Sequence, residues 1–390
     1  MTVKDELRVA IVGYGFMGAA HSQAWRTVNR AFDLPVNAVM TVLCGRDAQR
    51  AHAAAGKLGW PEVETDWRRM VERDDIDVVD VCTPGASHAE IAVAALTAGK
   101  HVLCEKPLAN SLAEADQMLA AARTAASRGV RSMVGYNYRR VPAVVFARRL
   151  VEQGRIGTIR HVRAQYLQDW IIDPAFPLVW RLQRDKAGSG SLGDLGAHLI
   201  DMAQYVTGDR ITGVGAITET FIKQRPLAES STGLSATGGS ATGEVTVDDA
   251  TLFHARFAGG AVGSFEATRF ATGHKNGLRL EVEGSDGALR FDVESMNELQ
   301  FYDARQPAAT AGFRRIVVTE PDHPYMSAWW PAGHIIGYEH TFTHEVRDFL
   351  EAIAGDTDPE PSFDTGAQVQ RVLAAVEGSA GDAGRWTAVS

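Results

Sequence analysis

The sequence has no apolar run close to the roughly 20 residues that a membrane-spanning helix needs, although 45% of its residues are hydrophobic. It also has no cluster of Lys or Arg, and its formal net charge of −9 argues against nucleic acid as a partner. The N-terminus, MTVKDELRVAIVG, lacks the apolar core of a signal peptide and enters a strand-like run almost at once. These absences predict a cytoplasmic protein whose partners include neither a membrane nor a nucleic acid.

Cysteine is scarce. The three cysteines, at positions 44, 82 and 104, have no CxxC spacing, and each lies at or near the end of an apolar run. This pattern argues against a disulfide framework or a zinc ribbon, so we interpret the three as small core residues. His340 and His344 have metal-compatible helical spacing, but no third ligand is evident. We expect no metal, and we predict that His340 lies near a substrate instead.

The length of 390 residues is too great for one ordinary core and favours two domains. Strand-like runs alternate with helix-like segments in the first part of the chain; after the first run they fall at 36–45, 76–84, 101–107 and 131–139. This alternation predicts an α/β domain with a doubly wound parallel sheet over residues 1–140. Strand patterns with turn signals at Gly259-Gly260 and Asp286-Gly287 predict an α+β domain with a mostly antiparallel sheet over 141–390.

One stretch of the second half is unusually poor in apolar residues. Residues 228–244, AESSTGLSATGGSATGE, are mostly Ser, Gly and Thr, a composition that packs poorly. We predict a mobile loop here, with a lid or a dimer arm as the alternative.

The first strand-like run ends in GYGFMG, which has the form GxGxxG. In this motif the first glycine, Gly13, makes a tight turn, and the second, Gly15, lets the backbone approach a pyrophosphate. The third, Gly18, allows close packing of helix and strand. Because the motif lies between a strand and a helix, it predicts a dinucleotide site that also includes Phe16 and Met17.

The choice between NAD and NADP is less clear from the sequence. An NAD-selective site usually has an acidic residue at the end of the second strand, where this chain has Cys44 and Gly45 followed by Arg46. Arg46 could pair with the 2′-phosphate of NADP, or it could stack on adenine and serve either cofactor. The predicted cofactor is therefore NAD or NADP.

Two further motifs end the strand-like runs at 76–84 and 101–107. The first, CTPGASH, contains Thr83, Pro84 and His88, and the second, CEKPLA, contains Glu105 and Lys106. Open α/β sheets bind ligands at the carboxyl ends of their strands. We therefore predict that these residues face the cofactor.

The segment GSGSLGDLGAHLIDMAQYVTG, residues 188–208, combines an apolar row with three polar groups. If a helix starts near Ser191 or Asp194, spacings of four and three place Asp194, His198 and Asp201 on one stripe. A neighbouring stripe of apolar residues would anchor the helix in a core; it consists of Leu195, Leu199, Met202 and Val206.

Together, GYGFMG, CTPGASH, CEKPLA and GDLGAHLID resemble the Gfo/Idh/MocA family of oxidoreductases, in the order in which that family has its motifs. Within the family, WRLQRDKAGSGSLGDLGAHLID and its distance from the EKP motif resemble dehydrogenases of levoglucosan and other cyclic sugars. The resemblance implies that Lys106, Asp194 and His198 form the catalytic set. It also implies a cis Lys106-Pro107 bond and a homodimer or homotetramer.

This resemblance implies an NAD(P)-dependent dehydrogenase that oxidises a secondary alcohol of a cyclic sugar or polyol. His198 suits the base, since imidazole exchanges a proton near neutral pH. Lys106 would stabilise the developing alkoxide. Asp194 could orient the imidazole or bind a substrate hydroxyl, and Asp201 is expected to be structural.

Residues flanking the catalytic helix offer polar groups and aromatic rings of the kind that bind sugars. The predicted substrate-binding residues are Tyr138, Arg139, Gln168, Asp169, Trp180, Arg181 and His340. Two alternatives stay open: glycoside hydrolysis by transient oxidation with a retained NAD, and a non-enzymatic nucleotide-sensing protein. A dehydrogenase releases reduced cofactor, whereas the glycoside hydrolase would retain its NAD, so cofactor release distinguishes these two functions. A nucleotide-sensing protein would be expected to have a degraded catalytic set.

Overall fold

The computed structural model describes residues 5–232 and 235–390, and the chain divides into two compact units. The first unit comprises Met1–Asn137 and Gly337–Gln370, and the second comprises Tyr138–Ile336 and Arg371–Ser390. We predicted a single division after residue 140. The structure differs in that Gly337–Gln370 also belongs to the first unit.

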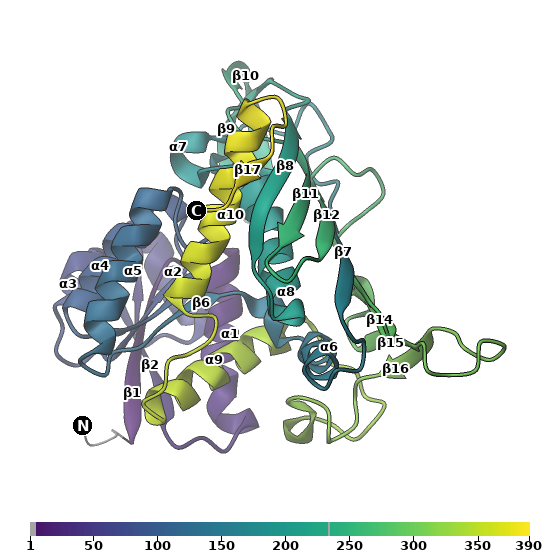
Figure 1. The fold of residues 1–390 in the computed structure, drawn as a ribbon. Coiled ribbons are helices and arrows are strands. Elements are labelled where there is room, and N and C mark those ends of the chain that lie inside the picture. The colour runs from purple at the N-terminus through teal and green to yellow at the C-terminus, as the bar shows by residue number, and fades with distance from the viewer. Residues whose placement is uncertain (1–4, 233–234) are drawn as a thin grey trace. The chain divides into compact units, whose positions relative to one another are not determined.

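The first unit, which contains the N-terminal strands β1 and β2 (Figure 1), is built on a parallel sheet in the order β3-β2-β1-β4-β5-β6. Its strands are β1 (Glu6–Val12), β2 (Asn37–Cys44), β3 (Glu62–Glu64), β4 (Val78–Val81), β5 (His101–Glu105) and β6 (Ser132–Gly135). The inner strands are apolar because both of their faces are buried; Val9, Ile11 and Val78 are fully inaccessible. The strand order reverses between β1 and β4, which places the ligand-binding switch point of such sheets beside the glycine loop. The predicted doubly wound sheet is confirmed.

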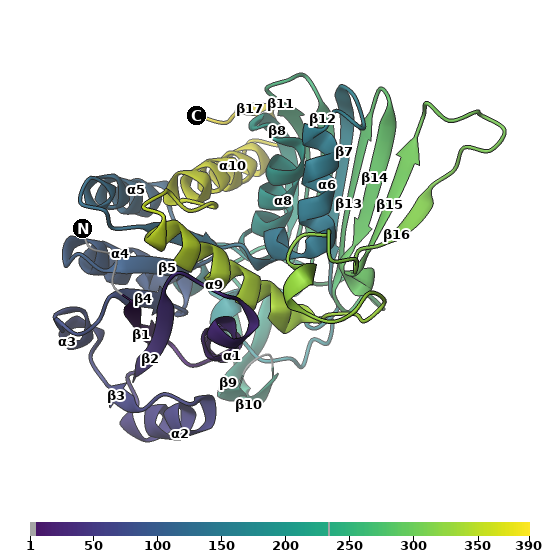
Figure 2. The same cartoon turned by 90° about the horizontal axis from the view of Figure 1, so that it is seen from below.

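Helices alternate with the strands of the first unit, and two further helices come from the C-terminal part of the chain. They are α1 (Phe16–Ala31), α2 (Ala48–Leu58), α3 (Trp67–Val71), α4 (His88–Thr97), α5 (Leu112–Ala126) and α9 (Tyr338–Ala354), and α10 (Phe363–Gly381) begins here. Helix α9 returns because its apolar face packs on α1 (Figure 2): Phe342, fully buried, contacts the ring of His21, and Tyr338 stacks on Phe16. Among the described residues, no helix is both long and apolar enough to cross a membrane.

The second unit is built on a large sheet in the order β16-β15-β14-β13-β7-β12-β11-β8-β17 (Figure 2). Its strands are β7 (Ile159–Leu167), β8 (Ile211–Glu219), β11 (Ala250–Phe257), β12 (Val262–Thr268), β13 (Gly277–Gly284), β14 (Gly287–Asp292), β15 (Glu298–Asp303), β16 (Arg314–Val317) and β17 (Thr387–Ala388). All neighbours are antiparallel except β7 and β12, so the predicted α+β class is confirmed. Gly259-Gly260 joins β11 to β12, and Asp286-Gly287 joins β13 to β14, as their turn signals predicted.

Helices α6 (Pro142–Glu152) and α8 (Ala197–Thr207) lie across one face of the large sheet (Figure 2). The predicted apolar row of α8 is buried, since Leu195, Leu199, Met202 and Val206 all have almost no exposed surface. A π-helical turn, η4 (Leu192–Gly196), precedes α8. Its wider winding changes the direction in which Asp194 points relative to the residues of α8.

The predicted loop at residues 228–244 is wrong. The described part of this stretch belongs to a two-stranded antiparallel hairpin of β9 (Gln224–Thr232) and β10 (Ser235–Glu244). The hairpin forms in spite of its composition because backbone pairing needs no apolar side chains. Residues 233 and 234 lie outside the described ranges.

Candidate active site

The glycine loop follows β1, and its three glycines have different surroundings. Gly13 has a φ of +102°, and a Cβ there would lie 2.7 Å from the carbonyl oxygen of Cys82. A Cβ on Gly18 would lie 2.2 Å from the carbonyl oxygen of Gly13, so the backbone itself requires both glycines. At Gly15, by contrast, a Cβ would meet no protein atom within 4 Å. A need for glycine at this position would therefore come from a ligand.

The N-terminus of α1 is suited to a phosphate. Gly15 is the N-cap, no side-chain hydrogen bond caps the helix, and its first turn has no acidic residue. Phe16 and Met17 begin this turn, and their amides lie at the positive end of the helix dipole. These features fit the pyrophosphate of a dinucleotide.

The end of β2 presents a basic side chain. Gly45 follows the strand and lies under the ring of Tyr14, because a Cβ on Gly45 would be 2.0 Å from a ring carbon of Tyr14. Arg46 comes next and is exposed. The first carboxylate after the strand, Asp47, caps helix α2. This strand end therefore offers Arg46, and not an acidic group, to the ribose of a dinucleotide.

His88 links the turns that follow β4 and β5. Its Nε2 lies 2.8 Å from the carbonyl oxygen of Thr83, which precedes Pro84, and its Nδ1 lies 3.0 Å from the carbonyl oxygen of Pro107. Burial lowers the pKa of His88. The Lys106-Pro107 bond is cis, as the resemblance implied. His88 was predicted to bind the cofactor, and its observed contacts hold two predicted cofactor turns together.

Asp194 is held by an arginine that the sequence analysis did not find. Its carboxylate accepts a hydrogen bond from Nη2 of Arg269 at 2.7 Å. Arg269 is fully buried, follows β12, and lies against the ring of Trp170 at 5.4 Å. Arg269 therefore fixes the orientation of this predicted catalytic carboxylate.

A second carboxylate fixes the start of the same helical segment. Asp248 accepts hydrogen bonds from the amides of Gly190 and Leu192 at 2.7 and 2.8 Å. It also accepts from the hydroxyls of Ser191 and Thr251 at 2.6 and 2.9 Å. A Cβ on Gly190 would lie 1.8 Å from the carbonyl oxygen of Asp248, so glycine is required for this close approach.

His198 is 6% exposed and lies beside two tyrosines. Its ring is 4.8 Å from that of Tyr138 and 6.1 Å from that of Tyr166, between centroids. The two tyrosine hydroxyls are 2.9 Å apart, and the amide of Asn276 accepts from Tyr166 at 2.8 Å and donates to Tyr138 at 3.2 Å. Gln168 also donates to Asn276. Burial raises the pKa of Tyr138, which favours its neutral hydroxyl beside His198.

Asp201 and Arg139 form a buried ion pair. The Nε and Nη2 atoms of Arg139 donate to the Asp201 carboxylate at 2.6 to 2.9 Å, and the two side chains are only 6% and 2% exposed. The guanidinium also lies over the ring of Tyr205. The expected structural role of Asp201 fits this pair, which holds Arg139 against α8. Asp194 thus pairs with Arg269, His198 lies beside two tyrosines, and Asp201 pairs with Arg139.

The remaining predicted substrate residues are distributed over both units. Asp169 accepts from Lys275, whose hydrogen bond lowers the pKa of that carboxyl. In the same unit the guanidinium of Arg181 lies 4.5 Å from the ring centre of Trp180. His340 belongs to the first unit, where its Nδ1 accepts from the amide of Gly337. The predicted metal-spaced partner of His340, His344, is fully buried against Phe32.

Sequence reasoning missed Arg269, Asp248, Asn276 and a buried histidine, His21. Arg269 and Asn276 lie just outside strands, and no spacing pattern links them to the helix that they support. His21 follows the glycine loop directly, but a histidine on a helix gives no sign of the partners that it meets. In the described ranges, His21, Asp80 and Cys82 also place potential metal-ligand atoms within 4.8 Å of one another.

A glycine loop at the switch point of a parallel sheet, followed by a helix whose N-terminus has no side-chain cap, defines a dinucleotide-binding protein. Residues 7–136 match the oxidoreductase family with an NAD-binding Rossmann fold, and residues 144–290 match the GFO/IDH/MocA C-terminal domain. The chain belongs to the Gfo/Idh/MocA family of oxidoreductases, and its first unit carries the NAD-binding Rossmann fold of that family.

The chain is similar to proteins of known structure or activity over nearly all of its length. It is 42% identical to the levoglucosan dehydrogenase of Pseudarthrobacter phenanthrenivorans over 96% of each chain. A levoglucosan dehydrogenase solved with NADH and levoglucosan aligns over 99% of both chains with a TM-score of 0.92 and 41% identity. An oxidoreductase domain protein from Kribbella flavida aligns over 99% of this chain and all of that one, with a TM-score of 0.95 and 61% identity.

Proposed function

We propose that this protein is an NAD-dependent dehydrogenase that oxidises a secondary alcohol of a cyclic sugar such as levoglucosan. The observation that carries the proposal is the helix of Asp194 and His198, in which Arg269 holds the carboxylate and two tyrosines flank the imidazole. The full-length similarity to a levoglucosan dehydrogenase supports the substrate class.

In the proposed mechanism, Lys106, Asp194 and His198 are the catalytic residues. His198 takes the proton of the substrate hydroxyl, and the cationic amine of Lys106 stabilises the negative charge that develops on that oxygen. Asp194, fixed by Arg269, binds a neighbouring sugar hydroxyl. NAD, when bound, supplies the carbon that accepts the hydride.

A screen of cyclic substrates tests this function. Levoglucosan, myo-inositol and 1,5-anhydro sugars would each be mixed with NAD⁺ or NADP⁺, and absorbance of the reduced nicotinamide would be followed. The proposal expects multiple turnovers with at least one cyclic sugar. Turnover without release of reduced cofactor would favour glycoside hydrolysis, and cofactor binding without any reaction would favour a nucleotide-sensing protein.

Substitutions then test the catalytic residues. General-base assistance contributes about 10²–10⁴-fold, so His198→Ala and Lys106→Ala should each lower kcat by a factor in that range while NADH affinity stays near normal. Loss in the double variant should be smaller than the product of the single losses, because both residues serve one proton transfer. His254→Ala, on an exposed position of β11, is the matched control. Near-normal turnover of His198→Ala would remove the helix from the mechanism.

We propose NAD as the preferred cofactor, with Arg46 stacked on adenine. The family fold is NAD-binding, and Arg46 is the exposed side chain at the end of β2. Arg46→Ala should then weaken NADH and NADPH to a similar extent. A loss of about tenfold or more for NADPH alone, as expected for a charge-assisted contact worth roughly 1.5–3 kcal/mol, would instead assign Arg46 to the 2′-phosphate.

We propose that the substrate is bound by polar and aromatic side chains of both units. Gln168 and Tyr138 belong to its hydrogen-bonded surroundings, and Asp169, Trp180 and Arg181 offer polar and aromatic surfaces of the kind that sugars bind. His340 and Arg139 complete the proposed set. Trp180→Ala should raise the KM for the sugar and leave NADH affinity unchanged; an unchanged KM would remove Trp180 from the set.

We also propose a homodimer or homotetramer located in the cytoplasm. The face of the large sheet that carries Ile217 and Leu252 supports self-association, because these paired residues are exposed on neighbouring strands. Cys44, Cys82 and Cys104 are free thiols, which supports a reducing compartment. Light scattering after size exclusion should give a multiple of 42.1 kDa, and a double Ile217→Asp, Leu252→Asp variant should elute as a monomer.

A further inference from the structure

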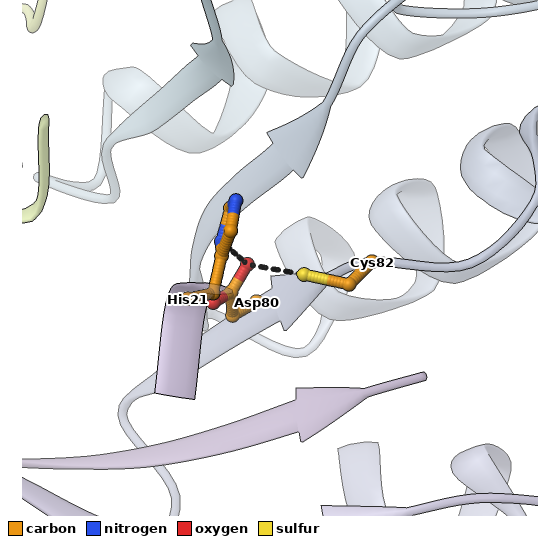
Figure 3. Close-up of side chains that lie close together, drawn as sticks. All are labelled: His21, Asp80 and Cys82. Atoms are coloured by element: carbon orange, nitrogen blue, oxygen red, sulfur yellow. Dashed lines mark hydrogen bonds and ion pairs between the residues drawn. The ribbon is translucent and has the colours of Figure 1, made fainter. Parts of the chain in front are cut away.

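A buried charged cluster lies inside the first unit, where α1, β4 and β5 meet. Figure 3 shows two of its side chains, His21 and Asp80, beside Cys82. The Nδ1 atom of His21 lies 2.9 Å from one oxygen of Asp80 and 3.0 Å from the other. The opposite ring nitrogen, Nε2, lies 3.0 Å from an oxygen of Glu105. The side chains of His21 and Asp80 are wholly inaccessible, and that of Glu105 is 5% exposed.

The geometry of the ring indicates its charge. Each ring nitrogen of His21 faces a carboxylate oxygen, so both nitrogens donate hydrogen bonds when the ring is an imidazolium. Burial by itself would lower the pKa of His21, but the charges of Asp80 and Cys82 and the hydrogen bonds to both side chains together outweigh it and raise that pKa well above its usual value. The His21 imidazolium thus lies between the carboxylates of Asp80 and Glu105 and compensates their buried negative charge. Removing one partner from such a buried ion pair is strongly destabilising.

Both carboxylates have further hydrogen bonds that connect the cluster to its surroundings. Asp80 accepts from the indole N–H of Trp25 at 2.7 Å. Its other oxygen accepts from the thiol of Cys82 at 3.4 Å, as Figure 3 shows. The second oxygen of Glu105 accepts from the backbone N–H of Lys106 at 3.0 Å. A continuous set of hydrogen bonds therefore runs from the helix after the glycine loop to the peptide of the proposed catalytic lysine.

The same atoms could in principle bind a metal ion, since His21, Asp80 and Cys82 each offer one ligand atom. However, the carboxylate of Asp80 already accepts from the imidazole, the indole and the thiol. A cation in contact with Asp80 would have to displace these donors. The arrangement is therefore that of a hydrogen-bonded ion network.

We propose that His21, Asp80 and Glu105 are positioning residues, which fix the turn of Lys106 against the helix of the glycine loop and so set the place of the Lys106 amine for catalysis. This inference rests on the proposed function, because it assigns the network a role through Lys106. Removing the imidazolium leaves the Glu105 carboxylate without its cation, and that carboxylate is the group that holds the Lys106 peptide. Displacements of about 1 Å in an active site can cost on the order of 10²-fold in rate.

The test uses His21→Gln, which keeps a hydrogen-bonding side chain and removes the charge. We expect kcat to fall by about 10- to 100-fold, with little change in the Kd of NADH. The matched control is His101→Gln at the other end of β5, where the histidine accepts from the amide of Arg131; its kcat should equal that of the wild type. If His21→Gln does not fold, Glu105→Gln, which keeps the shape of the side chain, replaces it.

A double-mutant cycle with Lys106→Ala separates positioning from general damage to the fold. If the network acts through Lys106, His21→Gln should have little further effect on kcat in the Lys106→Ala background. Equal losses in both backgrounds, an unchanged kcat in His21→Gln, or stoichiometric zinc in the purified protein would each overturn the inference.

A second readout does not depend on turnover, so failure of the proposed function and failure of this inference can be told apart. Reductive methylation with ¹³C-formaldehyde labels lysine amines, and the Lys106 signal is assigned by its loss in Lys106→Arg. Its chemical shift should differ between the wild type and His21→Gln but not between the wild type and His101→Gln. An identical Lys106 signal in all three proteins would overturn the inference even if no sugar is oxidised.

Discussion

Removal of the Asp248 carboxylate should destabilise the helix that carries the proposed catalytic histidine. The Asp248 carboxylate accepts hydrogen bonds from the backbone amides of Gly190 and Leu192 at 2.7 and 2.8 Å, and both hydrogen bonds are buried. Each buried donor that loses its partner costs about 1–3 kcal/mol, so Asp248→Ala should lower the free energy of unfolding by about 2–6 kcal/mol. For a unit of this size, a loss of 3 kcal/mol corresponds to a Tm lower by roughly 6–12 °C.

Thermal unfolding followed by circular dichroism measures this effect. Asp248→Asn keeps the shape and one acceptor oxygen, so its Tm should fall between those of the wild type and Asp248→Ala. Asp185→Ala, an exposed acidic position in the short helix α7 (Arg184–Ala187), is the control and should change stability by about 1 kcal/mol or less. A Tm of Asp248→Ala within about 2 °C of the wild type, less than 1 kcal/mol for a unit of this size, would refute the reasoning.

Three further predictions follow from the same structure. Gly15→Val should abolish NADH binding in a fluorescence titration with Tm unchanged, whereas Gly18→Ala should lower Tm because its Cβ would meet backbone at 2.2 Å; normal NADH affinity in Gly15→Val would contradict the pyrophosphate assignment. Asp201→Asn should cost about 3–5 kcal/mol in urea unfolding, because it removes the carboxylate charge of a buried ion pair with Arg139; a loss below about 1 kcal/mol would contradict this. The raised pKa of His21 should make its stabilising effect complete below about pH 6.5 and lost as pH rises through the folded pKa. The stability difference between the wild type and His21→Gln should therefore shrink at alkaline pH, and a difference that grows there would contradict an imidazolium.

Features encoded by neighbouring residues could be predicted from the sequence. The glycine loop, the strand ends with Thr83 and Lys106, and the apolar row of α8 all depend on local spacing, which sets strand, turn or helix directly. The parallel, doubly wound arrangement of the first sheet also followed from the alternation of strands and helices, whereas the order of its strands was not predicted.

Features that depend on residues far apart in the chain could not be predicted from the sequence. Arg269 is 75 residues from Asp194, and Arg139 is 62 residues from Asp201; no periodicity joins residues so far apart. The π-helical turn before α8 also escaped prediction, since a regular helical spacing was assumed from Asp194 onward. Low apolar content suggested a loop where β9 and β10 pair, because composition reports side-chain packing and not backbone pairing.

The central claim is that hydride passes from a carbon of a cyclic sugar to NAD on this protein. The most direct test incubates the purified protein with NAD⁺ and levoglucosan deuterated at its ring carbons, and analyses both products by mass spectrometry. The account predicts reduced nicotinamide that carries one deuterium and is released in equal amount with a ketone of the sugar, at a rate that falls on the order of 10²-fold or more in His198→Ala. Bound NAD⁺ that never acquires deuterium, from levoglucosan or from any other deuterated cyclic sugar or polyol, would contradict it.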